Sequence, residues 1–249
     1  MKKIFDRLFY SGPMSLGDTF VSTGIIHWFG DRCDELHLPV LPKFYKTLAT
    51  LFQDHPNIKV VALLPHDQGE NQYVLANRLS RIHRADLMNT IINGVNITAM
   101  WDIQIYANYE LPYSLRYSNF RLPKHIEGSE ELYERLGKSE PYALIHKFSN
   151  DFPQGAPIDI PTFRHNQDLP EIKIIEVTEE ITDNMMQYVD LIKNAEEIHC
   201  IPSSFHCLVD GIETKAKLYF HDIREKTSMA VNSIWNNYKW NMVFYQKRL

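Results

Sequence analysis

The chain of 249 residues lacks several features that define whole classes of proteins. It has three cysteines, an odd number with no closely spaced pair, which indicates no disulfide framework and favours a reducing compartment. No window approaches the roughly 18 apolar residues of a membrane-spanning helix, and no continuous apolar segment of a signal peptide follows the first charged residues. We therefore expect a cytoplasmic protein with no transmembrane segment, whose mature chain begins at or near Met1.

Cofactor and metal motifs are also missing. Without a Gly-x-Gly-x-x-Gly or Walker A sequence, a nicotinamide enzyme and a P-loop nucleotide enzyme lose their main support. There is no Gly-x-Ser-x-Gly elbow for a serine hydrolase and no Asp-x-Asp for a manganese-dependent transferase. His199-Cys200 and His206-Cys207 repeat a pair, but without the Cys-x2-Cys spacing that would favour a zinc site. We expect no metal and no bound cofactor.

A strong excess of charge of one sign is absent as well. With 26 basic and 31 acidic side chains, the net charge of -5 argues against a surface built to neutralise a nucleic-acid backbone. Arg78, Arg81 and Arg84 form a local basic face, for which a solvated helix end is the alternative. At 44% hydrophobic and 23% charged residues, the chain is typical of a globular protein with one large or two small domains.

The stretch 10–23 marks the end of an apolar run and the start of a helical pattern. Ser11-Gly12-Pro13 interrupts the strand expected before it, and apolar residues recur at helical spacing from Val21 to Phe29. Strand-like and helix-like segments then alternate, namely a strand at 35–40, a helix at 42–52, a strand at 58–64, a helix at 71–82 and a strand between 85 and 95. This order predicts a parallel sheet with crossover helices.

The second half repeats the alternation after a linker candidate at 137–141. The expected elements are strands at 142–147, 172–177, 197–201 and 217–221, and helices that start near 182 and near 207. The predicted boundaries are 1–138 for the first domain, 139–225 for the second, and 226–249 for a helical tail that packs back on the body. The fold class is α/β, with two Rossmann-like doubly wound domains facing a cleft.

Between the two halves, the segment 101–136 is rich in aromatic residues and irregular in pattern. It has two interpretations. It is a connecting helix and loop that packs its aromatic rings on the first domain, or it is a wall of a pocket for an acceptor molecule.

Polar residues gather where the first helix opens. Ser15, Gly17, Asp18 and Thr19 follow the first expected strand, and open α/β folds bind ligands at the carboxyl ends of their strands. Asp18 can accept a proton from an attacking hydroxyl as a general base. The same Asp18, or Thr19, can instead cap the helix.

A second polar turn, Pro202-Ser-Ser-Phe-His206, joins a strand to a helix in the second half. The hydroxyls of Ser203 and Ser204, a free helix N-terminus and the imidazole of His206 suit a diphosphate. Serine is also an ordinary helix-capping residue at such a turn.

Three further residues are expected near this second turn. His146 and Lys147 end the first strand of the second half and would add one or two cations to the same site. Lys147 has a solvated surface charge as its alternative. Glu176 ends the next strand, where the ribose of a nucleotide could lie, or it is an exposed loop carboxylate.

These two turns carry a family resemblance. Leu16-Gly-Asp-Thr-x3-Thr23 after an N-terminal strand resembles the Leu-Gly-Asp-x4-Thr opening of the heptosyltransferase-like glycosyltransferases. A strand, then Ser203-Ser-Phe-His206, then a helix is similar to their second signature, in which Asp-Ser/Thr-Gly followed by His receives the donor diphosphate. The resemblance spans both halves in order and implies the GT-B fold of two Rossmann-like domains, in a compact form.

The resemblance also implies roles for residues. Asp18 becomes the base, Ser203, Ser204 and His206 become phosphate ligands, and Lys147 becomes the lysine that contacts phosphate. The chain departs from the family in having Pro202 in place of Asp, a shorter interval from Ser to His, and a shorter length. The identity of the transferred sugar therefore does not carry over.

The resulting hypothesis is a metal-independent glycosyltransferase that moves a sugar from a nucleotide-sugar to a hydroxyl of a glycan or lipid-linked acceptor. One alternative is a non-catalytic module of the same fold that binds a nucleotide or a sugar. Another is a bacteriophage-type transferase that glycosylates hydroxymethylated DNA bases.

Overall fold

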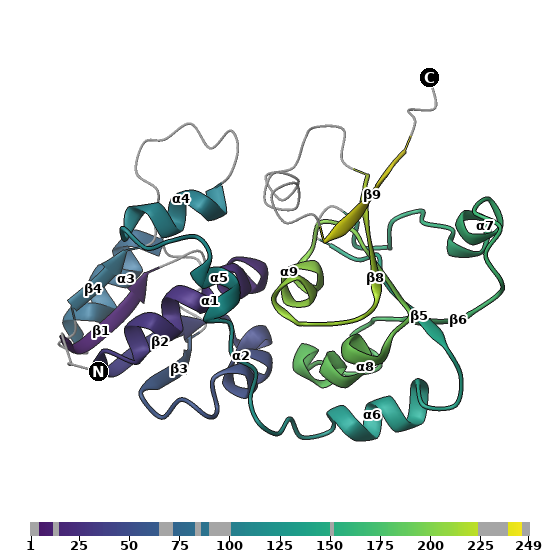
Figure 1. Ribbon diagram of the computed structural model, residues 1–249. Helices are drawn as coiled ribbons and strands as arrows, with labels where there is room; N and C mark the ends of the chain where they lie inside the picture. The colour runs from purple at the N-terminus through teal and green to yellow at the C-terminus, as the bar shows by residue number, and fades with distance from the viewer. Residues whose placement is uncertain are drawn as a thin grey trace. The chain divides into compact units, whose positions relative to one another are not determined.

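The computed structural model describes residues 5–11, 15–64, 72–82, 86–89, 101–149, 152–223 and 239–245. The chain divides into two compact units, Met1–Ile126 and Glu127–Leu249, and each unit contains one parallel sheet (Figure 1). The α/β class with two parallel sheets is therefore confirmed.

The first sheet is built from β1 (Phe5–Ser11), β2 (Cys33–Val40), β3 (Ile58–Ala62) and β4 (Asp86–Asn89), in the order β3-β2-β1-β4. Its crossovers contain α1 (Leu16–Gly30), the 3-10 turn η1 (Pro42–Phe44) with α2 (Tyr45–Leu51), and α3 (Gln72–Ile82). Parallel crossovers are right-handed, so a reversal of direction after β3 places α1 and α2 on one face and α3 on the other.

The aromatic segment forms α4 (Trp101–Asn108) and α5 (Leu115–Ser118), and both helices pack on α1. The Tyr106 hydroxyl donates to the Val21 carbonyl at 2.9 Å, and its side chain is fully buried. The buried Arg116 donates to Asp102 at 2.6 Å, as does the Tyr113 hydroxyl at 2.6 Å. For these residues the structure supports the packing interpretation of the segment.

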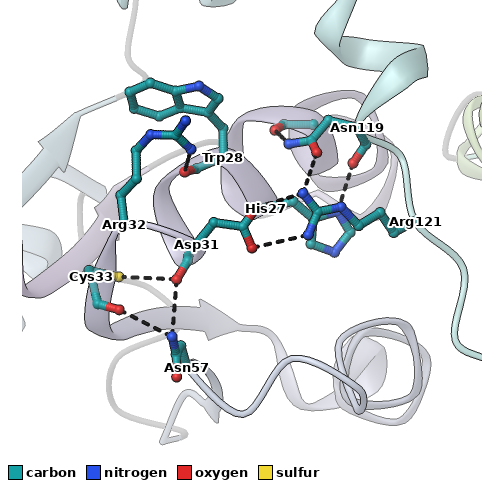
Figure 2. A network of polar contacts seen from close by, with 10 residues as sticks. His27, Trp28, Asp31, Arg32, Cys33, Asn57, Asn119 and Arg121 are labelled. Carbon is teal, nitrogen blue, oxygen red and sulfur yellow. Dashed lines mark hydrogen bonds and ion pairs between the residues drawn. The ribbon is translucent and has the colours of Figure 1, made fainter. Parts of the chain in front are cut away.

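A polar network fixes the chain after α5 to the C-terminal end of α1 (Figure 2). The Asn119 side chain donates to the Gly24 carbonyl at 2.8 Å, and the His27 Nδ1 lies 2.9 Å from the Asn119 carbonyl. Arg121 adds a charged contact by donating to Asp31 at 3.0 Å. Burial lowers the pKa of His27 to about 4, so its ring is neutral and the network carries one ion pair.

The close approach of α5 to α1 depends on Gly24. A Cβ atom at this position would lie 2.2 Å from the Leu115 carbonyl oxygen and 2.9 Å from the Tyr106 hydroxyl. The Leu115 oxygen belongs to the backbone and cannot rotate away, so α1 and the α4–α5 segment would have to separate.

We expect Gly24→Ala to lower the free energy of unfolding by about 1–3 kcal/mol, the usual cost of overpacking a core. Urea denaturation of both variants measures it, with Asn108→Ala at the exposed end of α4 as the control, expected within about 0.5 kcal/mol of the parent. Equal midpoints for the two variants would contradict the contact.

The second sheet contains β5 (Tyr142–His146), β6 (Lys173–Glu176), β7 (Glu197–Cys200), β8 (Lys217–Asp222) and β9 (Trp240–Phe244), in the order β6-β5-β7-β8-β9. Its helices are α7 (Ile160–His165), the 3-10 turn η3 (Met185–Tyr188) with α8 (Val189–Asn194), and α9 (Ser204–Gly211). Handedness places α7 on one face and α8 and α9 on the other.

The structure moves the predicted domain boundary. The division falls after Ile126, before α6 (Ser129–Leu136), which packs on η3 and α8 of the second unit. The Asp190 N–H donates to the Ser129 hydroxyl at 3.1 Å, and Leu132 is buried. The expected linker at 137–141 is part of this unit, because a Cβ on Gly137 would meet the Tyr142 ring at 2.6 Å.

The predicted helical tail at 226–249 is also corrected where the structure describes it. Residues 240–244 form β9, which extends the sheet parallel to β8. The Trp240 indole donates to Asp210 on α9 at 3.0 Å, so the edge strand is tied to the helix. Residues 226–238 and 246–249 lie outside the described part of the chain.

A chain of polar contacts crosses the face of this sheet on the side of α7. The Arg164 guanidinium pairs with Glu197, whose carboxylate lies 3.3 Å from His199 Nε2. His199 Nδ1 lies 2.9 Å from His221 Nε2, and His221 Nδ1 lies 2.6 Å from the Tyr245 hydroxyl. Except for the exposed Tyr245, the members of the chain are buried.

The carboxylate at one end of this chain of contacts determines which ring nitrogen of each histidine carries the hydrogen. A carboxylate only accepts, so the hydrogen of His199 is on Nε2, and its Nδ1 accepts from His221 Nε2–H. His221 Nδ1 then accepts from the Tyr245 hydroxyl. Burial lowers the pKa of His199 and lowers that of His221 to about 3, so both rings are neutral. The chain thereby joins α7, β7, β8 and the end of β9 without an unpaired charge.

Lowering the pH should therefore reduce the free energy of unfolding already at pH values above those at which the carboxylates titrate. The pKa of His221 is lowered from 6.5 to about 3, so the unfolded chain binds the extra proton, and stability present above about pH 6.5 is lost as the pH falls. Each such histidine contributes up to roughly 1.4 kcal/mol per pH unit.

Urea denaturation at neutral and mildly acidic pH measures this loss. His221→Gln should reduce the difference in unfolding free energy between the two pH values, and the exposed-site control His165→Gln should leave it unchanged. An identical pH slope in His221→Gln and the parent would show that His221 is not the titrating group.

Candidate functional site

Both sheets reverse their strand order beside the first strand of the unit. β1 lies between β2 and β4, and β5 lies between β6 and β7. Where the strand order reverses, the connections that follow two adjacent strands run in opposite directions. Open α/β sheets bind ligands at this place, beside the carboxyl ends of the strands. The residues predicted as a site follow β1 in the first unit, and β5, β6 and β7 in the second.

Ser15 is the N-cap of α1, which corrects the prediction that Asp18 or Thr19 caps this helix. The Asp18 N–H donates to Ser15 Oγ at 3.2 Å, and the Ser15 hydroxyl donates in turn to the Asp18 carboxylate at 2.5 Å. Gly17 lies within the first helical turn. Thr19 is buried and its hydroxyl donates to the Ser15 carbonyl at 3.0 Å, so this side chain serves the helix start.

The Asp18 side chain is half-buried and keeps one carboxylate oxygen, Oδ1, without a hydrogen bond to any described residue. Burial raises the pKa of Asp18, and the hydrogen bond from Ser15 opposes part of this rise. A carboxylate with a raised pKa holds a proton more tightly and is a stronger general base. Asp18 therefore has the properties of a base near the switch point of the first sheet.

The second unit brings Ser203 and His146 together. Ser203 is the N-cap of α9 and its hydroxyl oxygen accepts from the His206 N–H at 3.3 Å. The same oxygen lies 3.0 Å from His146 Nδ1, at the end of β5. The His146 ring stacks on Phe205, with centroids 5.2 Å apart. The bond thus joins the carboxyl ends of β5 and β7, the two strands that flank the switch point.

Ser204 is the first residue of α9 and is half-exposed. Its hydroxyl makes no hydrogen bond to another residue that the structure describes. The first N–H groups of a helix have no intrahelical partner, and the helix dipole favours an anion beside them. Ser204 and the start of α9 therefore suit a phosphate group.

The structure corrects the prediction for the His206 side chain. It is 1% exposed, and its ring lies 4.9 Å from the Phe220 ring and 4.9 Å from the Trp240 ring. A ring enclosed by these aromatic residues does not reach a phosphate at the sheet edge. The contribution of His206 to the turn is its backbone N–H.

Lys147 and Glu176, predicted separately, form an ion pair at 2.8 Å. Burial lowers the pKa of His146 to about 4, so its ring is uncharged at neutral pH. The prediction of one or two cations is corrected to a neutral imidazole and a lysine that is already paired.

The sequence does not show the bond between His146 and Ser203, nor the stacking of Phe205 on His146. The available signal was their position, since His146 ends β5 and Ser203 follows the neighbouring strand β7. None of the helices in the described ranges combines the length and the hydrophobicity of a membrane-spanning helix. His, Cys, Asp and Glu side chains of those ranges form no group of three or more that could hold a metal ion.

We expect Ser15→Ala to raise the pKa of Asp18 further, because the hydrogen bond that lowers it is lost. Loss of the cap should also cost about 1 kcal/mol of stability. Carbon NMR of the Asp18 carboxyl as a function of pH measures the shift. Ser15→Thr keeps a hydroxyl and is the control, and a Ser15→Ala titration that matches the parent would refute the interaction.

Among known proteins, similarity to this chain is found in solved structures and not in sequence. No family model matches the sequence, and no curated protein matches it. The chain is similar to the solved structure of a glycosyl transferase family 9 protein from Veillonella parvula, with a TM-score of 0.55 and 10% identity over 100% of this chain and 90% of that chain. It is also similar to the ADP-heptose LPS heptosyltransferase II of E. coli, with a TM-score of 0.53 and 10% identity over 97% of this chain and 91% of that chain.

A third similar structure is the bacterial iron-containing dodecameric glycosyltransferase TibC from enterotoxigenic E. coli. Its TM-score is 0.52 at 12% identity, over 88% of this chain and 58% of that chain. At these identities the similarity concerns the fold. The chain has the GT-B-like fold of heptosyltransferase-like glycosyltransferases, as its two motifs indicated.

Proposed function

We propose that this protein is a glycosyltransferase that moves a sugar from a nucleotide-sugar to an acceptor hydroxyl. The observation that carries the proposal is the edge of the second sheet, where the start of α9, Ser203 and Ser204 offer hydrogen-bond donors beside a strand-order reversal. This edge suits a diphosphate. The fold that it shares with glycosyltransferases supports a sugar nucleotide as the diphosphate's source.

In the proposed reaction, the acceptor oxygen bonds to the anomeric carbon of the donor sugar while the bond from that carbon to the diphosphate breaks. The acceptor proton passes to Asp18, and the electron pair of the broken bond leaves with the nucleoside diphosphate. The N–H groups of α9 and the hydroxyls of Ser203 and Ser204 stabilise the departing charge. These donors act in place of a metal ion.

Two other residues have subsidiary roles in this proposal. Lys147 contacts the diphosphate by exchanging part of its ion pair with Glu176 for phosphate oxygens. Glu176 then lies near the ribose of the donor. A glycan or a lipid-linked molecule is the proposed acceptor, in the cytoplasm.

A second candidate is a module that binds a nucleotide-sugar without transferring it. Two observations favour it. Pro202 stands at the first position of the second turn, and the His206 side chain is enclosed by aromatic rings. Both remove polar groups that the related motif presents to the donor.

Thermal shift with a panel of UDP-glucose, ADP-glucose, GDP-mannose and their free nucleoside diphosphates tests donor binding. The glycosyltransferase should be stabilised by at least one donor and should also hydrolyse it slowly to the nucleoside diphosphate. Stabilisation without turnover, with or without added acceptors, would favour the binding module. No stabilisation by any donor would refute both.

We expect Asp18→Asn to bind the donor with unchanged affinity and to lose transfer by a factor of about 10²–10⁴, the usual contribution of a general base. Initial rates and donor titration measure the two properties. Asp31→Asn changes a carboxylate at the other end of α1 and is the control, expected to retain transfer. Full activity of Asp18→Asn would overturn the assignment of the base.

A further inference from the structure

We infer that His146 is a positioning residue that takes up a proton when a sugar nucleotide binds, and so turns the Ser203 hydroxyl toward the diphosphate. The inference rests on the proposed function and adds a regulatory property to the same site. Its starting point is the hydrogen bond between His146 and Ser203 and the number of hydrogens that these two side chains can donate.

A serine hydroxyl has one hydrogen to donate and two lone pairs that accept. One lone pair of Ser203 already accepts from the His206 N–H at 3.3 Å. At 3.0 Å, His146 Nδ1 and Ser203 Oγ share one hydrogen, which belongs either to the hydroxyl or to the ring. If the hydroxyl donates to Nδ1, Ser203 has no hydrogen left for a phosphate oxygen.

The reverse arrangement frees the hydroxyl. When Nδ1 carries a hydrogen and donates it to the second lone pair of Ser203, the hydroxyl hydrogen is available for an anion at the start of α9. A protonated imidazole has hydrogens on both nitrogens and can only donate. Protonation of His146 therefore fixes Ser203 as a donor to the ligand.

The surroundings of His146 keep its ring neutral in the absence of a ligand, so that its protonation state depends on ligand binding. The side chain is 8% exposed and packs against the rings of Phe205 and Phe148. Burial lowers its pKa to about 4, and no charged group among the residues that the structure describes contributes to that shift. The nearby Lys147 is paired with Glu176. The ring is thus neutral until a negative charge arrives.

A bound diphosphate supplies that charge. An anion near a histidine favours the charged imidazole and raises its pKa. The proton comes from solvent and is retained on His146, whose Nε2 has no hydrogen bond to a described residue. The diphosphate of a sugar nucleotide is a diester that is fully ionised near neutral pH, so the ligand neither gains nor loses a proton in the same range.

The sign of the pH dependence follows. The complex holds more protons than the free protein between the low pKa of free His146 and its raised pKa in the complex. Affinity therefore rises as the pH falls, by up to about tenfold per pH unit within this window. Above the raised pKa, affinity no longer depends on His146.

Calorimetric titration of the full chain with ADP-glucose, UDP-glucose and GDP-mannose tests this inference. Measurements at about pH 6 and about pH 8, each in two buffers of different ionisation enthalpy, give the affinity and the number of protons taken up. The parent should bind at least about threefold more tightly at the lower pH, with net proton uptake.

Two variants assign the proton. His146→Asn keeps an N–H group near the position of Nδ1 but does not titrate, so binding should persist while proton uptake and pH dependence disappear. His165→Asn changes an exposed histidine on α7 and should retain both. Urea midpoints at about pH 8 check that each variant is folded.

The outcomes separate the two hypotheses. Binding without proton uptake, or with uptake that persists in His146→Asn, would overturn the role of His146 and leave the proposed function standing. Absence of binding to all three donors would refute the proposed function, and the role of His146 with it.

Discussion

The reversal of strand order beside β1 and β5 is the constraint on which both candidate sites depend. Right-handed crossovers carry the chain away from these strands in opposite directions. A crevice is therefore left at the carboxyl ends of two neighbouring strands, where no helix covers both ends. Asp18 follows β1 at one such point, and His146 and Ser203 flank the other. The chemistry of each unit is therefore positioned by topology before any side chain is considered.

Burial then decides which polar groups carry charge. In the protein without a ligand, burial lowers the pKa of His146, His199 and His221, so all three rings are neutral at neutral pH. Each has its own hydrogen-bond partner, which avoids the cost of an unsatisfied buried group. Asp18 is affected in the opposite direction, since burial penalises its ionised form and raises its pKa. Neutral imidazoles and a more basic carboxylate are two consequences of the same desolvation.

The sequence predicted the fold class and most strands, because a buried strand bounded by turn residues is a local pattern. It failed where assignment depended on a distant partner. α6 belongs to the second unit because Ser129 and Leu132 contact that unit, and a charged helix beside a glycine does not reveal this. Likewise, Trp240 lies in a strand because β8 is available to pair with it.

The site shows the same division. Local sequence by itself determined that polar residues follow β1, β5, β6 and β7, because strand ends and helix caps are set by nearby residues. Only the tertiary structure decided that Ser15 caps α1, that Lys147 pairs with Glu176, and that the ring of His146, not the ring of His206, contacts the Ser203 hydroxyl. The physical reason is that a side chain's charge and direction depend on what covers it. Those covering residues, such as Trp240 over His206, come from parts of the chain that no local pattern connects.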